Sequence, residues 1–126
     1  MFIISKCLLG ENCKYDGGNN RNEEVIEFCR THEYIAVCPE TAGKLPCPRP
    51  PAEISGDKVI DKEGNDVTFN FRNGAYSCFL DCLKEAAARG EKLEGAILKA
   101  DSPSCGHGQI YDGTFTGTLT EGNGIF

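Results

Sequence analysis

Eight cysteines are the residues of this sequence best suited to chemistry. Cysteine thiolates bind zinc and iron–sulfur clusters, and they also act as redox or sulfur-carrying groups. The sequence has neither the paired Cys-x-x-Cys knuckles of structural zinc sites nor the dense cysteine run of bacterial ferredoxins. The cysteines stand singly, which suits a compact cluster held by several separate loops.

Three of these cysteines, Cys7, Cys38 and Cys105, each follow a predicted strand. In an open parallel sheet the carboxyl ends of the strands lie along one edge, where ligands bind. We therefore expect the three thiols to meet in space. On a four-iron cluster, three thiolates would leave one iron open as a Lewis acid for a soft atom such as sulfur.

The other five cysteines fall into two groups. Cys78 and Cys82 lie on the apolar stripe of a predicted helix, and Cys29 lies on the inward face of another, so we predict that all three are core residues. Cys13 and Cys47 lie in the loops near the first three. Each is open to three interpretations: a fourth ligand, a resolving thiol or an incidental residue.

The elements that must position these cysteines alternate between strand and helix. Strands are predicted at Phe2–Ser5, Tyr34–Val37 and Gly95–Lys99, and helices at Arg21–Thr31, capped by Asn20 or Asn22, and at about Thr68–Arg89, ended by Gly90. This order predicts an α/β fold, a single Rossmann-like domain whose small parallel sheet is flanked by helices. The five prolines of Pro39–Pro51 predict a segment too stiff for a helix or a central strand.

Composition excludes some classes of partner. The chain has 126 residues, with 13 basic and 19 acidic side chains, and 13 − 19 gives a net charge of −6. Because an acidic surface repels phosphate backbones, we expect no nucleic-acid partner for this chain alone. No stretch approaches the roughly 20 apolar residues of a membrane span, and the N-terminus lacks the basic leader of a signal peptide. We therefore expect a cytoplasmic protein that does not contact membranes.

One tripeptide occurs twice, as Tyr15–Gly17 and as Tyr111–Gly113, each time shortly after a cysteine of the loops. Asp-Gly is a turn dipeptide, and we interpret both copies as turns.

Six blocks of the sequence carry a resemblance to a known family. In chain order they are Cys7–Gly10, Cys13–Gly18, Val37–Glu40, Leu45–Ile54, Lys99–Gly106 and Ile110–Phe115. Together they span nearly the whole chain, and they resemble the DUF523 family, whose characterised members are thiouracil desulfurases. The resemblance identifies residues 1–126 as a single DUF523-like iron–sulfur domain.

The resemblance implies a 4Fe–4S cluster held by three cysteines, with the fourth iron binding the thiocarbonyl sulfur of the substrate. Carried onto this sequence, the ligands are Cys7, Cys38 and Cys105. The implied substrate is a thiolated pyrimidine, and the reaction converts 2-thiouracil and water to uracil and hydrogen sulfide without net electron transfer. A thiol compound is a further candidate partner, as acceptor of the released sulfur.

The hydrolysis also needs a proton acceptor. Glu40, two residues after Cys38, is the candidate base that takes the proton of the attacking water. Ser102 and Ser104 are candidates for hydrogen bonding the substrate ring or for relaying a proton.

Two further charged residues belong to the same blocks. Arg49 is open between offsetting cluster charge, orienting a substrate oxygen and bracing its loop against Asp16. Glu53 is expected to cap a turn or a helix.

Two other classes of function fit the same cysteines. One is a redox or persulfide sulfur-carrier protein without a cluster, in which Cys7 with Cys13, or Cys47 with its neighbours, forms disulfides or persulfides. The other is a non-catalytic iron–sulfur or zinc module that serves a partner. Glu40 favours the desulfurase, because a carrier needs no carboxylate beside a ligand.

Overall fold

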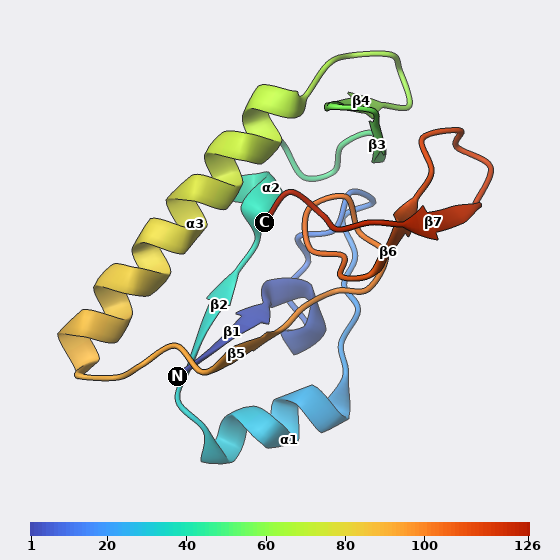
Figure 1. Ribbon diagram of the computed structural model, residues 1–126. Helices are drawn as coiled ribbons and strands as arrows, with labels where there is room; N and C mark the ends of the chain where they lie inside the picture. The colour runs from blue at the N-terminus through green and yellow to red at the C-terminus, as the bar shows by residue number, and fades with distance from the viewer.

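The computed structural model describes all of residues 1–126. Its centre is a three-stranded parallel sheet in the order β2-β1-β5. The strands are Phe2–Ser5 (β1), Tyr34–Val37 (β2) and Gly95–Ile97 (β5). The long helix α3 covers one face of the sheet and helix α1 the other (Figure 1). The α/β class and the small parallel sheet predicted from the sequence are confirmed.

Strand β1 is buried on both faces, which explains why its first three residues are apolar. Because successive side chains of a strand point to opposite faces, Ile3 and Ile4 enter different cores. Ile3 packs toward α3, in a cluster with Val37, Cys78 and Cys82. Ile4 packs toward α1, in a cluster with Cys7, Leu8 and Val25, against which half-buried Cys29 packs. The core positions predicted for Cys78 and Cys82 are therefore confirmed, whereas Cys29 is only half-buried and packs against the second cluster.

The two main helices begin and end at sequence signals. Helix α1 spans Glu23–Thr31, and it starts after Asn22 because the side chain of Asn22 accepts hydrogen bonds from the N–H groups of Glu24 and Val25. Helix α3 spans Thr68–Arg89 and ends at Gly90, whose φ of 66° is the left-handed conformation that favours glycine.

The proline-rich segment departs from its prediction, because it begins with a short helix, α2, at Pro39–Ala42. Expecting no helix there was wrong. Pro39 occupies the first turn, where a helix does not use the backbone N–H that proline lacks. A second short helix, the 3-10 helix η1 at Lys6–Leu9, directly follows β1.

Two antiparallel hairpins were not predicted. One joins Ala52–Ser55 (β3) to Lys58–Asp61 (β4), and the other joins Gln109–Tyr111 (β6) to Leu119–Glu121 (β7). Both lie apart from the central sheet (Figure 1). The turn interpretation of the repeated tripeptide is confirmed, since Gly17 and Gly113 have φ values of 79° and 92°. None of the helices has the length and apolar character needed to cross a membrane.

Helix α2 is fixed by a close crossing with α3. A Cβ added at Gly74 of α3 would overlap the carbonyl oxygen of Pro39, and one added at Gly43 would overlap the carbonyl oxygen of Asn70. The Asn70 side chain also donates to the carbonyl oxygen of Gly43 at 2.8 Å. The backbones therefore touch, and this contact sets the position of Glu40 on α2.

We expect Gly74→Ala to destabilise the protein by about 2–3 kcal/mol, because the new methyl group forces α2 away from α3. The sign is diagnostic, since the same change inside an unobstructed helix stabilises by about 1 kcal/mol. Urea unfolding followed by circular dichroism measures the difference. Asn73→Ala, at the neighbouring exposed position of α3, is the control and should not destabilise. A Gly74→Ala variant as stable as the parent would contradict the crossing.

Candidate active site

A cavity of about 490 Å³ lies at the carboxyl ends of the parallel strands. Its lining includes Ser5 and Val37, the last residues of β1 and β2, and Lys99, two residues after β5. Ala52 of β3 and Tyr111 of β6 line it from the hairpins. The cavity therefore occupies the edge where an open parallel sheet binds ligands.

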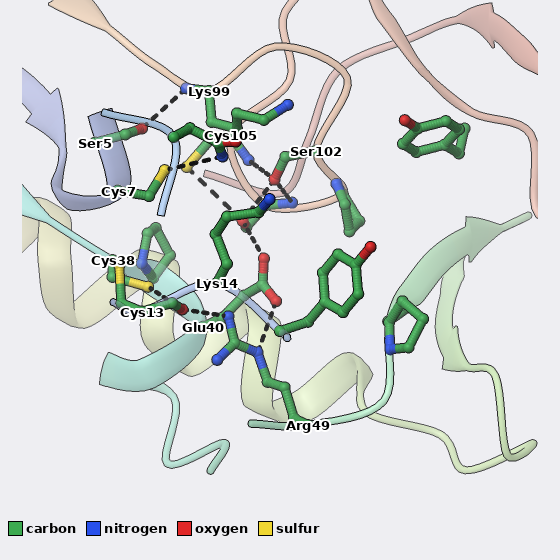
Figure 2. Close-up of a pocket in the computed structure, with 18 of the residues that line it drawn as sticks. Ser5, Cys7, Cys13, Lys14, Cys38, Glu40, Arg49, Lys99, Ser102 and Cys105 are labelled. Atoms are coloured by element: carbon green, nitrogen blue, oxygen red, sulfur yellow. Dashed lines mark hydrogen bonds and ion pairs between the residues drawn. The ribbon is translucent and has the colours of Figure 1, made fainter. Parts of the chain in front are cut away.

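The three cysteines selected from the sequence all line this cavity. Cys7 comes from η1, Cys38 stands between β2 and α2, and Cys105 lies in the loop between β5 and β6. Figure 2 shows their sulfur atoms along one wall, with that of Cys13 beside Cys38. Cys47 is exposed and outside the lining, and its Sγ contacts the carbonyl oxygens of Asn12 and Lys14 at 3.1 and 3.2 Å.

The thiols differ in how easily they ionise. A hydrogen bond from the Cys13 thiol lowers the pKa of Cys38, and the same contact raises the pKa of Cys13. Burial raises the pKa of Cys105 to about 11, and burial also raises the pKa of Cys7. Cys38 is therefore the thiol that most readily becomes the thiolate that a metal binds.

Polar side chains contact the other two sulfur atoms. The Asn20 amide donates to Cys7 Sγ at 3.7 Å, and Ser104 Oγ lies 3.7 Å from Cys105 Sγ. The hydrogen bond from Asn20 orients the Cys7 sulfur and favours its charged form.

Glu40 lies in the cavity in a buried ion pair with Arg49. Arg49 Nε is 3.1 Å from Glu40 Oε1, and the Arg49 and Glu40 side chains are 4% and 16% exposed. The guanidinium also donates to the carbonyl oxygens of Cys13 at 2.8 Å and Pro46 at 3.2 Å. Asp16 instead accepts from the N–H of Gly18, so the brace between Arg49 and Asp16 is not formed.

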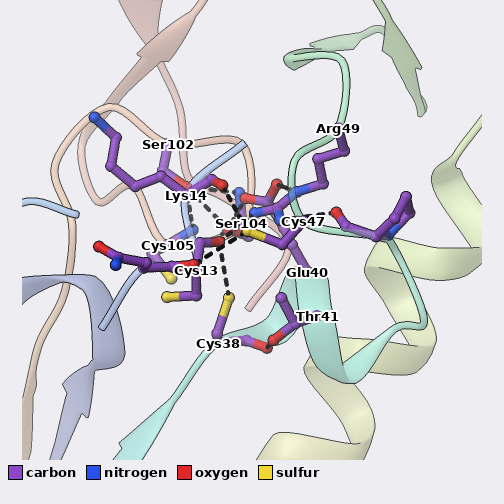
Figure 3. A network of polar contacts seen from close by, with 12 residues as sticks. Cys13, Lys14, Cys38, Glu40, Thr41, Cys47, Arg49, Ser102, Ser104 and Cys105 are labelled. Atoms are coloured by element: carbon purple, nitrogen blue, oxygen red, sulfur yellow. Dashed lines mark hydrogen bonds and ion pairs between the residues drawn. The ribbon is translucent and has the colours of Figure 1, made fainter. Parts of the chain in front are cut away.

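Ser102 and Ser104 join Glu40 in a chain of hydrogen bonds (Figure 3). Ser104 Oγ donates to Glu40 Oε2 at 2.7 Å, which uses its single proton because a carboxylate is the stronger acceptor. The Ser102 hydroxyl, 2.9 Å away, must then donate to Ser104. Ser102 Oγ in turn accepts from the N–H of Cys105 at 3.0 Å, which ties the chain to the ligand loop.

The cavity is basic although the protein is acidic. Five cations line it, against the two carboxylates of Glu40 and Glu53, so its formal charge is 5 − 2 = +3 while the whole chain carries −6. The cations are Lys6, Lys14, Arg49, Lys62 and Lys99. A positive lining attracts anions and offsets the charge of thiolates.

Four lysines, Asn20 and three aromatic residues also line the cavity and were not predicted as site residues from the sequence; the aromatic residues are Tyr15, Tyr111 and Phe115. Lys99 could have been found, because it ends a predicted strand at the edge where the cysteines were expected to meet. The others come from η1, loops and hairpins, and no local pattern revealed that these segments meet at the cavity. All six residues predicted for the site, namely Cys7, Cys38, Glu40, Ser102, Ser104 and Cys105, border this one cavity.

The donor set fits an iron–sulfur cluster. No three His, Cys, Asp or Glu side chains lie close enough together to hold a single metal ion. Three separately carried thiols instead border a cavity of about 490 Å³, which gives room to a group of several atoms. Thiolates are the usual protein ligands of such clusters.

Comparisons with known proteins agree with this chemistry. Residues 2–126 match the model of the 2-thiouracil desulfurase family. A Bacillus subtilis (strain 168) protein, the uncharacterized protein YbbK, is 34% identical over 135 residues, covering 99% of this chain and 85% of the relative. The solved structure of TudS, named as a 4Fe-4S-dependent thiouracil desulfidase, is 40% identical with a TM-score of 0.82, covering 98% of this chain and 80% of that one.

Proposed function

Since this chain belongs to the 2-thiouracil desulfurase family, we propose that it is a 4Fe–4S-dependent enzyme that converts 2-thiouracil and water to uracil and hydrogen sulfide. The observation that carries the proposal is the cavity itself. It gathers three separately carried thiols and a hydrogen-bonded carboxylate at one sheet edge.

Cys7, Cys38 and Cys105 hold the cluster through their sulfur atoms. When bound, the cluster supplies an open iron that acts as a Lewis acid towards the thiocarbonyl sulfur of the substrate. Lys6, Lys14 and Lys99 line the same cavity and reduce the electrostatic cost of gathering three thiolates in one place. Cys13 also lines the cavity, and its carbonyl oxygen accepts hydrogen bonds from Cys38 Sγ at 3.9 Å and from Arg49 at 2.8 Å, so we assign it a supporting position beside Cys38 and not a ligand role.

Glu40 is the general base. Its Oε1 is held by the Arg49 guanidinium, so Oε2, which shares a hydrogen bond with Ser104, is the oxygen that takes the proton of the attacking water. Ser104 and Ser102 give that proton a path along two hydroxyl groups. Arg49 keeps the carboxylate in one orientation, because its other donors are fixed on backbone carbonyl oxygens.

The sulfur leaves as hydrogen sulfide in this scheme. Hydrolysis exchanges a carbon–sulfur bond for a carbon–oxygen bond and needs no electrons from outside. Transfer to a thiol acceptor would make a persulfide, which requires the removal of two electrons by an external oxidant. We therefore propose hydrogen sulfide as the product, with a thiol acceptor acting only where such an oxidant is present.

The test is turnover by protein purified without oxygen. We expect about four irons and four sulfides per chain and equal amounts of uracil and sulfide from 2-thiouracil. Chromatography and a sulfide assay measure the products, and 4-thiouracil assayed in parallel defines the ring position. Iron-loaded protein that releases no sulfide from either compound would contradict the proposal. Iron-free protein carrying a persulfide would instead support the sulfur carrier.

A further inference from the structure

A buried carboxylate controls one loop of the cavity wall. Glu53 of β3 is 8% exposed, and its Oε1 accepts hydrogen bonds from the N–H groups of Gly113 at 3.0 Å and Phe115 at 3.2 Å. Both donors lie in the turn between β6 and β7, about sixty residues further along the chain. Bonds from N–H groups to an ionised carboxylate are stronger than neutral ones. Glu53 therefore fixes the backbone of this turn.

The turn is held in a costly conformation. Phe115 has a φ of 59°, the left-handed region that residues with a side chain rarely adopt. Gly113 lies so close to β3 that an added Cβ would come within 2.8 Å of the Ile54 carbonyl oxygen. A left-handed residue other than glycine costs about 1–2 kcal/mol and persists where the surrounding contacts impose it. Here the two bonds to Glu53 impose it.

The conformation of this turn places Phe115 in the cavity lining. Phe115 is half-buried and lines the cavity together with Tyr15 and Tyr111. These three are the only aromatic residues of the lining, and Tyr15 and Tyr111 come from the repeated Tyr-Asp-Gly turns. Aromatic rings bind flat heterocycles by stacking on their faces, and a pyrimidine offers such a face whatever its substituents.

We propose that Phe115 is a substrate-recognition residue whose ring packs against the pyrimidine, and that Glu53 is the positioning residue that holds Phe115 in place. This inference rests on the proposed function, because it takes the substrate to be a pyrimidine. The two carboxylates of the cavity then have separate roles, since Glu40 acts on water and Glu53 shapes the wall.

Glu53 has a rival role that the test must separate. Its Oε2 makes no hydrogen bond and is accessible to solvent, since no fully buried side-chain polar atom lacks a partner, and Glu53 lines the cavity. A solvent-accessible carboxylate oxygen of a lining residue could serve as a base. Glutamine separates the roles, because it keeps an oxygen that accepts the two N–H bonds but cannot take up a proton at neutral pH.

The first experiment removes the Phe115 ring with a substitution that is compatible with the left-handed backbone conformation of the turn. Phe115→Gly removes the ring, and glycine adopts the left-handed conformation without strain. We expect KM for 2-thiouracil to rise about tenfold, the equivalent of ~1.4 kcal/mol, with kcat within about twofold of the parent. Calorimetry with uracil should show a matching loss of affinity, and iron content should not change.

Phe115→Tyr keeps a ring and should restore KM to within about twofold, whereas Phe69→Leu, at an exposed position of α3, should change nothing. A Phe115→Gly enzyme with the parent's KM and uracil affinity would overturn the proposal. A parent enzyme that does not act on thiopyrimidines would instead overturn the proposed function, so the two failures are distinguishable.

The second experiment addresses Glu53. We expect Glu53→Ala to raise KM about as much as Phe115→Gly does, and the double variant to raise it no further, because both changes remove the same contact. Glu53→Gln should retain kcat and keep KM within about threefold. A loss of kcat by about a hundredfold in Glu53→Gln, with KM unchanged, would make Glu53 a base and overturn its positioning role. If Glu53→Ala does not fold, the Phe115 variants and Glu53→Gln decide.

Discussion

Replacing Cys7, Cys38 or Cys105 by alanine is expected to reduce bound iron from about four atoms per chain to less than one. Each of the three thiols comes from a different segment of the chain, so each substitution removes the ligand that its segment supplies. Only two protein thiolates would then bind the cluster, and free thiols in solution could displace them and remove it. Iron and sulfide analysis of protein purified without oxygen measures the loss.

Cys78→Ala and Cys47→Ala are the matched controls. Cys78 is buried in the core between the sheet and α3, and Cys47 is exposed outside the cavity lining, so both variants should keep their iron. Cys13→Ala should keep it as well. Iron loss from Cys13→Ala together with full iron in Cys7→Ala would replace Cys7 by Cys13 in the ligand set.

Glu40→Gln is expected to keep the cluster and to lower kcat by about 10²–10⁴-fold, the usual contribution of a general base. Glutamine has nearly the same shape, so its carbonyl oxygen can still accept a bond from Arg49 or Ser104. What it loses is the capacity to accept the proton of water. Steady-state kinetics with 2-thiouracil, normalised to iron content, measure the effect.

Glu63→Gln is a suitable control for this variant, because Glu63 is exposed in the turn after β4 and does not line the cavity. Full activity of iron-loaded Glu40→Gln would disprove the role of Glu40 as base. Glu53, the other carboxylate of the lining, would then be the next candidate.

Much of the central architecture could be predicted from the sequence, because local patterns specify it. The apolar runs at Phe2–Ser5 and Tyr34–Val37 are strands with those bounds, and the apolar spacing from Thr68 to Arg89 is one helix ended by Gly90. The rule that ligands bind at the carboxyl ends of parallel strands placed the three cysteines in one cavity.

What could not be predicted depends on contacts between distant segments. Helix α2 is four residues long and exists because Gly43, directly after α2, and Gly74 of α3 allow the two backbones to touch, which no local pattern reveals. The hairpin strands are three or four residues long, below the length at which alternation is informative. The bonds from Glu53 to residues 113 and 115 cross some sixty residues, so local patterns could identify Glu53 only as a capping acid.

Arg49 binds three separate groups, so mutations in this part of the protein will not have independent effects. One guanidinium connects the Glu40 carboxylate to the main chain at Cys13 and at Pro46, so these parts do not vary independently. Energies of groups that share one partner are not additive. Substitutions at Arg49 and Glu40 should therefore show strong epistasis. Alanine at either position removes the same Arg49–Glu40 contact, so adding the two single effects would count that contact twice.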